Sequence, residues 1–201
     1  PVGYAILGPC LAYLWLTDQS LGMSLRLAAQ GVNSWPLLAI PLFVLVGVTA
    51  NRAGIADRLF DFALALLGRV RGSLGYVNIG VSVGFSWMSG SALADAAGLG
   101  AVEVPAMRKQ GYPRNFSVGL SAASSVIAPI MPPSIPAIVY ASVATVSVGA
   151  LFAASVVPAF LLAAALALVV FLWARKRDEL RTERFSWPKV VRTFLHAAAA
   201  M

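Results

Sequence analysis

Apolar runs separated by short polar or basic clusters make up most of the chain. Residues 1–17 and 36–50 are apolar almost throughout, and residues 149–174 form a longer run of the same kind. The longest run is sufficient to cross a hydrocarbon core of roughly 30 Å at about 1.5 Å per helical residue. The pattern predicts membrane helices over all three ranges, the second of them opening with an early Pro36.

Two shorter segments have one polar face and one apolar face. Residues 21–30 form a short amphipathic piece, and residues 55–68 carry Asp57, Arg58 and Asp61 near their start with aliphatic residues beyond. A strong polar face on so short a helix favours the membrane interface over a position across the bilayer. We therefore expect 55–68 to be a lateral arm helix.

Residues 73–104 are apolar at both ends and break at the tripeptide SGS, residues 89–91. The stretch is too long for one crossing of a roughly 30 Å core and too short for two crossings with a loop. Basic clusters flank it at 68–72 and 107–114, and such clusters mark the cytoplasmic side of a membrane. We expect a re-entrant helical hairpin with both ends on that side.

A second apolar stretch, residues 115–146, is interrupted at Pro129 and again at PPSIP, residues 132–136. Proline lacks an amide donor and clashes with the preceding turn, so the stretch cannot be one continuous helix. We expect two half-helices, 115–128 and 135–146, with an unwound centre. The next residues are uncharged, which predicts a periplasmic position for Ser147.

Composition places the chain in a membrane and excludes several functions. Hydrophobic residues make up 59% of the chain and charged residues 11%, and the mean hydropathy is +0.81. The net charge of +7 comes from short basic clusters between apolar runs, which is typical of topology signals and not of nucleic-acid binding. Cys10 is the single cysteine, so no internal disulfide is possible, and no hydrolase or P-loop motif indicates an enzyme.

The two backbone breaks form a candidate ion site. If the hairpin packs against the broken helix, the tripeptide at 89–91 and the segment 132–136 meet at membrane depth, where unwound carbonyls can coordinate Na⁺. Prolines leave upstream carbonyls, including those of Ala128 and Met131, without amide partners. The alternative is that SGS is a small-residue helix contact and the proline segment a kink.

Ionisable side chains within the apolar stretches allow more than one role. Asp95 is a functional candidate because a carboxylate inside a membrane is expensive, or else it caps the second hairpin helix. We expect Glu103 to pair with Arg108 or to face the interface. Asn78 is expected to hydrogen-bond across helices, and Ser124 and Ser125 within theirs.

Four runs carry a family resemblance from end to end: WPLLAIPLFVLVG (35–47), SGSALADAAGLGAVEVPAMRKQGYPRNF (89–116), SAASSVIAPIMPPSIPAIVYASV (121–143) and SVGALFAASVVPAFLL (147–162). They resemble the large membrane subunit of TRAP transporters, the DctM-like permeases. The resemblance implies an all-α integral membrane protein of the bacterial inner membrane, one half of an inverted-repeat elevator-type transporter. It also implies Na⁺-driven import of an organic anion, typically a carboxylate, received from a periplasmic binding protein by a permease that works with a small four-helix membrane subunit.

The resemblance also implies site residues. The Na⁺ ligands, mostly backbone carbonyls, would be Ser89, Gly90, Ser91, Ala92, Ala128, Met131 and Pro133. Candidates for substrate contact or gating are Asp95, Asn78, Ser134 and Trp87. Two positions depart from the family pattern: Ala128 stands where glycine is common, which backbone ligation tolerates, and Trp87 stands where small residues are usual. Its indole either narrows the substrate cavity or packs against a neighbouring helix.

The expected organisation follows the chain. Scaffold helices occupy 1–50, the arm helix and a basic cytoplasmic loop 51–72, half of a transport domain 73–146 and a membrane helix 147–174. Residues 175–201 contain a hydrophilic cytoplasmic linker, 175–193, and the start of a second half, so we expect a fragment of a longer subunit. Two other functions fit the same pattern: a single-component Na⁺/anion symporter of related fold, and a membrane scaffold subunit that transports nothing.

Overall fold

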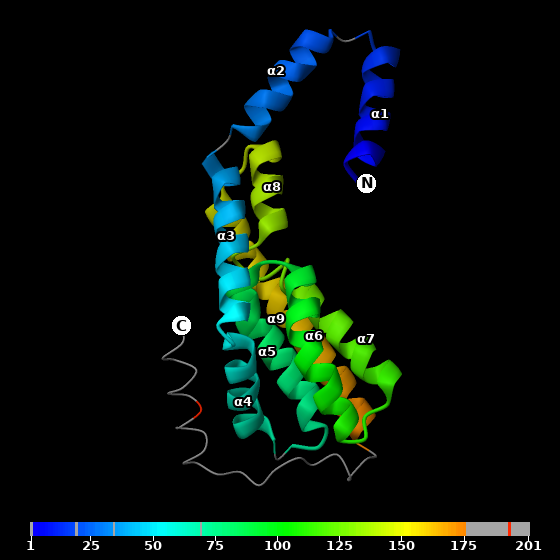
Figure 1. Cartoon of the computed structure of the whole chain (residues 1–201), viewed down its shortest axis with the longest axis vertical. Coiled ribbons are helices and arrows are strands. Elements are labelled where there is room, and N and C mark those ends of the chain that lie inside the picture. Colours follow the sequence, from blue (N-terminus) through cyan, green and yellow to red (C-terminus); the bar gives the residue numbers. More distant parts are fainter. Residues whose placement is uncertain (1, 19, 34, 69, 176–192, 194–201) are drawn as a thin grey trace.

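The computed structural model describes residues 2–18, 20–33, 35–68, 70–175 and 193, and all the regular structure in these ranges is helical (Figure 1). The linker predicted over 175–193 lies outside the described residues except at its two ends. In chain order the helices are α1 (Val2–Leu16), α2 (Leu21–Val32), α3 (Trp35–Arg52), α4 (Ile55–Leu67), α5 (Ser73–Ser89), α6 (Ala92–Lys109), α7 (Arg114–Ser124), the 3-10 helix η1 (Ser125–Ile127), α8 (Ile135–Ala144) and α9 (Val148–Ala174).

The helical hairpin and the broken second stretch are present as the sequence predicts, while the re-entrant position of the hairpin in a membrane stays a prediction. Helices α5 and α6 pack against each other as a hairpin with its turn at Gly90 and Ser91. The second stretch consists of α7 and η1, then a non-helical segment over 128–134, and then α8. Figure 1 shows α8 continuing beyond the tip of the hairpin, while α5 and α6 lie along the lower part of α9.

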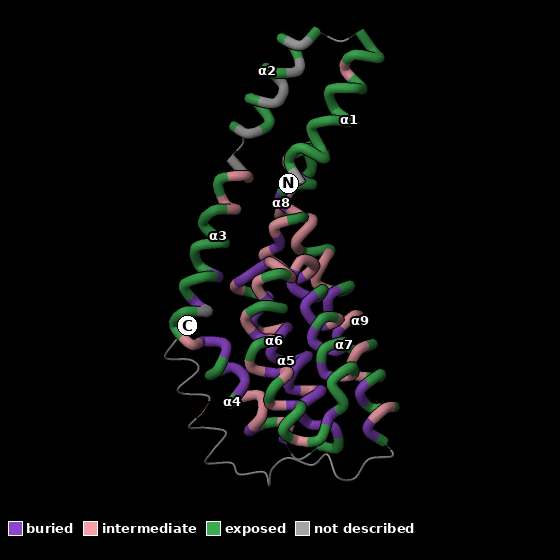
Figure 2. Tube along the Cα trace, turned by 45° about the vertical axis from the view of Figure 1, so that its right-hand side comes forward, coloured by how far each residue is buried: buried purple, intermediate pink, exposed green. Residues whose placement is uncertain are grey.

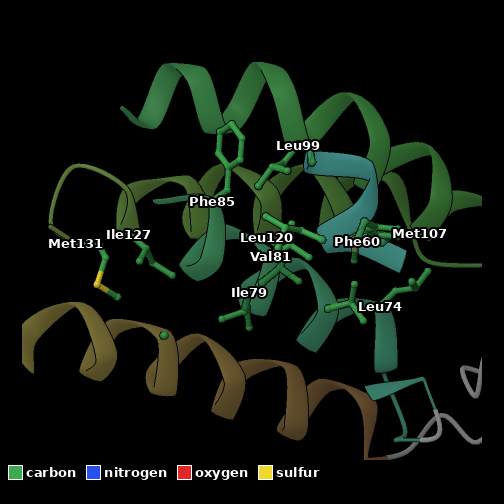
Figure 3. Close-up of a cluster of buried hydrophobic side chains, with 14 of the residues drawn as sticks. Phe60, Leu74, Ile79, Val81, Phe85, Leu99, Met107, Leu120, Ile127 and Met131 are labelled. Atoms are coloured by element: carbon green, nitrogen blue, oxygen red, sulfur yellow. The ribbon is translucent and has the colours of Figure 1, made fainter. Parts of the chain in front are cut away.

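Helix α5 is the centre of the bundle, because α3, α4, α6, α7 and α9 all pack against it. Its apolar side chains, among them Leu74, Val77, Val81 and Phe85, are buried in one hydrophobic cluster that includes Leu99 of α6 (Figure 3). Lipid tails are as apolar as these side chains, so van der Waals packing holds membrane helices together more than exclusion from water does. The shape of the α5 surface therefore decides how closely its neighbours approach.

Glycines at the start of α5 let α9 come close. A Cβ atom added to Gly72 would lie 2.6 Å from the Ala174 Cβ atom, and one added to Gly75 would lie 2.7 Å from Val170 Cγ1. Next to this contact the α6–α7 linker and the start of α7 pack against the end of α9 through stacked rings. The centroid of Trp173 lies 3.8 Å from that of Phe116 and 5.5 Å from that of Tyr112.

The periphery is exposed and apolar. Helix α1 is almost entirely exposed, whereas much of α5 is buried (Figure 2). Among the described residues, α9 is the one helix long and apolar enough to cross a membrane by itself, and α3 and α4 qualify together as a pair bent by 65°. The predicted amphipathic face of α4 is present, with Leu59 and Phe60 buried and Asp57 exposed, and its place in the interface stays a prediction.

Candidate functional site

The tip of the hairpin touches the break in the second stretch. Gly90 ends α5 in the left-handed conformation, with φ 56° and ψ 14°, and Ser91 caps α6 by accepting a hydrogen bond from the Ala94 amide at 3.4 Å. A Cβ atom at Gly90 would lie 2.3 Å from the Pro133 carbonyl oxygen. Only glycine fits this turn, both because of its φ and because of the close backbone approach. The predicted meeting of the two breaks is confirmed.

Ser134 organises the break itself. Its hydroxyl group donates a hydrogen bond to the Pro129 carbonyl and accepts one from the Ala137 amide at 3.2 Å, so it caps α8. The Ile127 carbonyl accepts from the amides of Ile130 and Met131 at 3.0 and 2.8 Å. These bonds satisfy part of the unwound backbone and fix the path of the chain around the prolines.

Other carbonyls at the two breaks stay unpaired. Within the described residues, no amide donates to the carbonyls of Ala128, Met131 or Pro133, and the first two residues are buried. At the tip, the Ser91 carbonyl accepts from the Asp95 amide at 3.1 Å, whereas no amide of the described residues donates to the Gly90 carbonyl. Buried backbone carbonyls are normally bonded, so this group of unpaired oxygens has capacity for a cation.

The remaining predicted ligands surround this contact. Ser89 is buried, and its hydroxyl oxygen has no hydrogen-bond partner in the described part of the chain. Helix α3 closes the tip from one side, since a Cβ atom at Gly47 would lie 3.3 Å from the Ser89 Cα atom. Ser91 and Ala92 are half-buried at the start of α6. The assignment of these residues to Na⁺ stays a prediction.

A buried polar seam runs from the tip into the interface between α5, α6 and α7. On α5, Asn78, Ser82 and Ser86 follow one another at four-residue spacing and are all buried, which places them along one face. The Ser82 hydroxyl donates to the Ser124 hydroxyl at 3.1 Å. The Asn78 amide nitrogen donates to the Ser121 hydroxyl at 2.7 Å. The predicted bond from Asn78 across helices is confirmed.

The two serines of the second stretch also bond as predicted. The Ser124 hydroxyl donates to the Ser121 carbonyl at 3.1 Å, and the Ser125 hydroxyl donates to the Ala122 carbonyl at 2.9 Å. These bonds tie each hydroxyl to its own helical turn.

The expectation for Glu103 was wrong. Its side chain is 1% exposed and accepts hydrogen bonds from Asn78 and, at 3.4 Å, from Ser121, while Arg108 is exposed. The signal that finds it is spacing: Glu103 continues a four-residue series on α6 whose other members, Asp95, Leu99 and Met107, are buried as well. Position in the series outweighs proximity to the basic loop.

Ser91 is the N-cap residue of α6, and Asp95 is the acidic residue in the first turn of that helix. Asp95 lies one turn beyond Ser91 and is 1% exposed. Its Oδ2 atom has no hydrogen-bond partner among the described residues. The arrangement places a carboxylate close behind the hairpin tip, which favours the functional alternative.

In the part of the chain that the structure describes, no neighbouring helix covers the Trp87 side chain. Its side chain is 62% exposed and lines a groove of about 570 Å³ on α5 together with Gly80, Val83, Gly84 and Met88. The expectation of packing was wrong for the described part of the chain. The expected role in narrowing a substrate cavity, and the roles of Asn78, Asp95 and Ser134 toward a substrate, stay predictions.

Comparison with known proteins gives one consistent result. The family described as the DctM component of the tripartite ATP-independent periplasmic transporter matches residues 1–201. The sialic acid TRAP transporter large permease protein SiaM of Vibrio cholerae is 45% identical over 190 residues, which cover 92% of this chain and 44% of that protein.

Two further relatives are named for other substrates. The 2,3-diketo-L-gulonate TRAP transporter large permease protein YiaN of Escherichia coli is 34% identical, over 100% of this chain and 48% of that protein. The C4-dicarboxylate TRAP transporter large permease protein DctM of Pseudomonas aeruginosa is 35% identical, over 84% of this chain and 39% of that protein. The chain therefore spans about half the length of the curated relatives it matches.

Proposed function

Because the chain belongs to the DctM family of tripartite ATP-independent periplasmic transporters, a family of permeases and not of enzymes, we propose that it is part of the large permease subunit of a Na⁺-coupled importer of an organic anion. The observation that carries the proposal is the close contact between Gly90 and the Pro133 carbonyl. This contact brings two discontinuous helices together in a polar, buried setting. Paired broken helices are the usual ion and substrate sites of secondary transporters.

The proposed substrate is a carboxylate. Relatives are named for sialic acid, 2,3-diketo-L-gulonate and C4-dicarboxylates, and each of these compounds bears a carboxylate group. In the proposed complex a periplasmic binding protein delivers the anion, and a small four-helix membrane subunit completes the permease in the inner membrane. The transport half would move against the scaffold as an elevator.

Uptake by the full-length permease in proteoliposomes tests the function. The three named anions serve as substrates, each with and without a Na⁺ gradient and with and without a binding protein. We expect uptake only when the Na⁺ gradient and the binding protein are both present. Uptake without the binding protein would favour a single-component symporter, and substrate binding or uptake in no condition would favour a scaffold subunit.

The proposed Na⁺ site lies between the hairpin tip and the break, at Ser89, Gly90, Ala128, Met131 and Pro133. Its support is the unpaired state of the buried carbonyls there. Replacing Pro132, Pro133 and Pro136 together by alanine should restore helix and engage those carbonyls. The Na⁺ concentration for half-maximal uptake should then rise, and apparent substrate affinity should weaken most at low Na⁺.

A proline inside a continuous helix is the matched control. Pro158 lies within α9, which is continuous on both sides of it, so Pro158→Ala should leave the Na⁺ dependence of uptake as in wild type. An unchanged half-saturation in the triple variant would make the break a simple kink and would move the ion site elsewhere.

The proposed topology places both ends of the hairpin in the cytoplasm. The α4–α5 and α6–α7 linkers and the end of α9 lie at one end of the bundle, where Arg71, Arg108 and Arg175 are exposed (Figure 1). Cysteines at 71, 108 and 147 should report this with an impermeant reagent, in a Cys10→Ser background because Cys10 is exposed. Labelling of position 147 alone from outside intact cells is expected, and labelling of position 108 would contradict the topology.

A further inference from the structure

The buried seam contains a carboxyl group for which the proposed transport mechanism has no use. Glu103 is 1% exposed, and its Oε2 atom accepts hydrogen bonds from the Asn78 amide nitrogen and from the Ser121 hydroxyl group. Its other oxygen, Oε1, has no hydrogen-bond partner among the described residues, and neither has the amide oxygen of Asn78, Oδ1. Two neighbouring side chains thus each keep one unpaired, fully buried oxygen.

Among the residues that the structure describes, none provides a counter-ion beside this carboxyl group. The ionisable groups on the helices packed against α6 are exposed or half-buried, and η1 carries none: Arg52 on α3, Asp57, Arg58 and Asp61 on α4, Tyr76 on α5 and Arg114 on α7. On α6 itself Arg108 and Lys109 are exposed, and the other buried group is Asp95, a second acid. An isolated ionised carboxylate in such a setting is strongly disfavoured, because the charge is desolvated without compensation, so the group is neutralised instead.

A cation at the hairpin tip is badly placed to neutralise Glu103. Asp95 lies close behind the tip, and Glu103 follows it by eight residues, or about 12 Å along the helix axis at about 1.5 Å per residue. A cation bound at the tip would interact more strongly with the nearer carboxylate, Asp95, than with Glu103. The carboxyl group of Glu103 must therefore be neutralised by something other than an ion at the tip.

We propose that Glu103 binds a proton and that Asn78, Glu103 and Ser121 form a buried proton-binding site that joins α5, α6 and α7. A carboxylic acid and a primary amide are complementary, because the amide N–H donates to one carboxyl oxygen and the acid O–H donates to the amide oxygen. The two oxygens without partners, Glu103 Oε1 and Asn78 Oδ1, are the atoms that such a pair joins. The reverse orientation of the Asn78 amide would bring its oxygen to Oε2 and would also require the proton.

The consequence for the bundle is a neutral, fully bonded junction between the hairpin and the broken helix. Ionisation would leave a buried charge and two unpaired oxygens, so Glu103→Gln, which imitates the protonated acid, should preserve the junction. Glu103→Ala should weaken it, because Asn78 and Ser121 lose a shared acceptor. The inference does not depend on the proposed Na⁺ coupling.

Infrared difference spectroscopy of the full-length permease at neutral pH tests the site, since the carbonyl stretch of a carboxylic acid is separate from that of a carboxylate. We expect a protonated-carboxyl band in wild type that is absent in Glu103→Gln and unchanged in Asp57→Asn, a control at an exposed acid on α4. The thermal midpoint should be retained in Glu103→Gln and lowered in Glu103→Ala.

Two results would overturn the proposal. Loss of only a carboxylate band in Glu103→Gln would mean that Glu103 is ionised. A protonated band that disappears when Na⁺ is added to the wild type would mean that a metal cation, not a proton, balances the charge in the working state. Because the spectra need no substrate or binding protein, neither result bears on whether the permease transports an anion.

Discussion

Helices α5 and α9 are both apolar, yet they differ in what they bury. The residues that α9 buries are small and apolar, Ala159, Ala163, Val170 and Ala174, and its Ser155 donates to the carbonyl of its own residue Phe152 at 2.9 Å. Helix α5 buries Asn78 and four serines, Ser73, Ser82, Ser86 and Ser89. A helix that faces lipid stays continuous and apolar, whereas one that carries oxygens is surrounded by other helices.

The interruption of α5 follows from the same difference. Helix α9 continues through Pro158 to Ala174, but α5 stops at Gly90 and turns back. The end of a helix leaves carbonyls without intrahelical partners, and here the end of α5 lies against the break after η1, where further carbonyls have no amide donor among the described residues. We therefore expect the functional site at the contact between the hairpin tip and the break, and we expect α9 to have a structural role.

The strongest test of this contrast is Gly90→Val. Valine would have to adopt a left-handed conformation, and its Cβ atom would lie 2.3 Å from the Pro133 carbonyl oxygen. The strain should cost about 3 kcal/mol or more and should separate the tip from the break. We expect Na⁺-driven uptake to fall to background while the protein still inserts into the membrane.

The control for this variant is another glycine of the hairpin. A Cβ atom at Gly100 meets nothing within 4 Å, so Gly100→Val should leave uptake near the wild-type rate. Equal uptake by the Gly90 and Gly100 variants would contradict a function centred on the tip.

A second test concerns the contact between α5 and α9, using two glycines in the same backbone conformation. Gly72 has φ 75° and ψ 25°, and Gly54 has φ 71° and ψ 25°, each as the N-cap of its helix. A Cβ atom at Gly72 meets Ala174 Cβ at 2.6 Å, whereas at Gly54 the nearest atom is Asp57 Oδ2 at 3.9 Å. Gly72→Ala should cost about 3 kcal/mol, from the left-handed conformation and from overpacking together.

Gly54→Ala should cost only about 1 to 2 kcal/mol, because it carries the conformational part alone. Thermal midpoints of the two variants in detergent give the difference. If the two midpoints fall equally, the close contact between α9 and the start of α5 is absent from the protein in detergent.

A third test compares two serine caps. Ser134 and Ser147 each accept a hydrogen bond from the amide three residues on, at 3.2 and 3.3 Å, but Ser134 is buried and also donates to the Pro129 carbonyl. Ser147→Ala should cost about 1 kcal/mol, the usual value of a cap. Ser134→Ala should cost about 2 kcal/mol, because it also leaves a buried carbonyl unpaired.

The two variants are compared by their thermal midpoints and by uptake. Only Ser134→Ala should also raise the Na⁺ concentration for half-maximal uptake, since it loosens the break. A larger thermal effect at Ser147 would show that the break is not stabilised through Ser134.

The sequence predicts the architecture because its signals are local. A glycine between two serines and a cluster of prolines interrupt apolar runs wherever they occur, and both breaks were found at the predicted residues. The burial of Glu103 was not predicted, because basic residues nearby suggested an ion pair, and only the helical series that begins at Asp95 indicates otherwise. Exposure of Trp87 was missed for a related reason, since burial depends on which neighbours reach a helix face.

The smallest expected effect is that of Tyr112→Phe, in the linker that packs against the end of α9. Its ring is buried and stacks on Trp173, with centroids 5.5 Å apart. Burial raises the pKa of its phenol to about 12, so the group stays protonated through neutral pH. The oxygen lies near the amides of Leu74 and Gly75, but in the described residues no contact has the geometry of a hydrogen bond.

Tyr112→Phe should therefore change stability by less than about 1 kcal/mol in either direction, since no bond is lost. Tyr112→Ala should cost about 3 kcal/mol, because it removes a stacked ring from the core. Thermal midpoints in detergent distinguish the two, and a large loss in Tyr112→Phe would mean that the hydroxyl group anchors the start of α5.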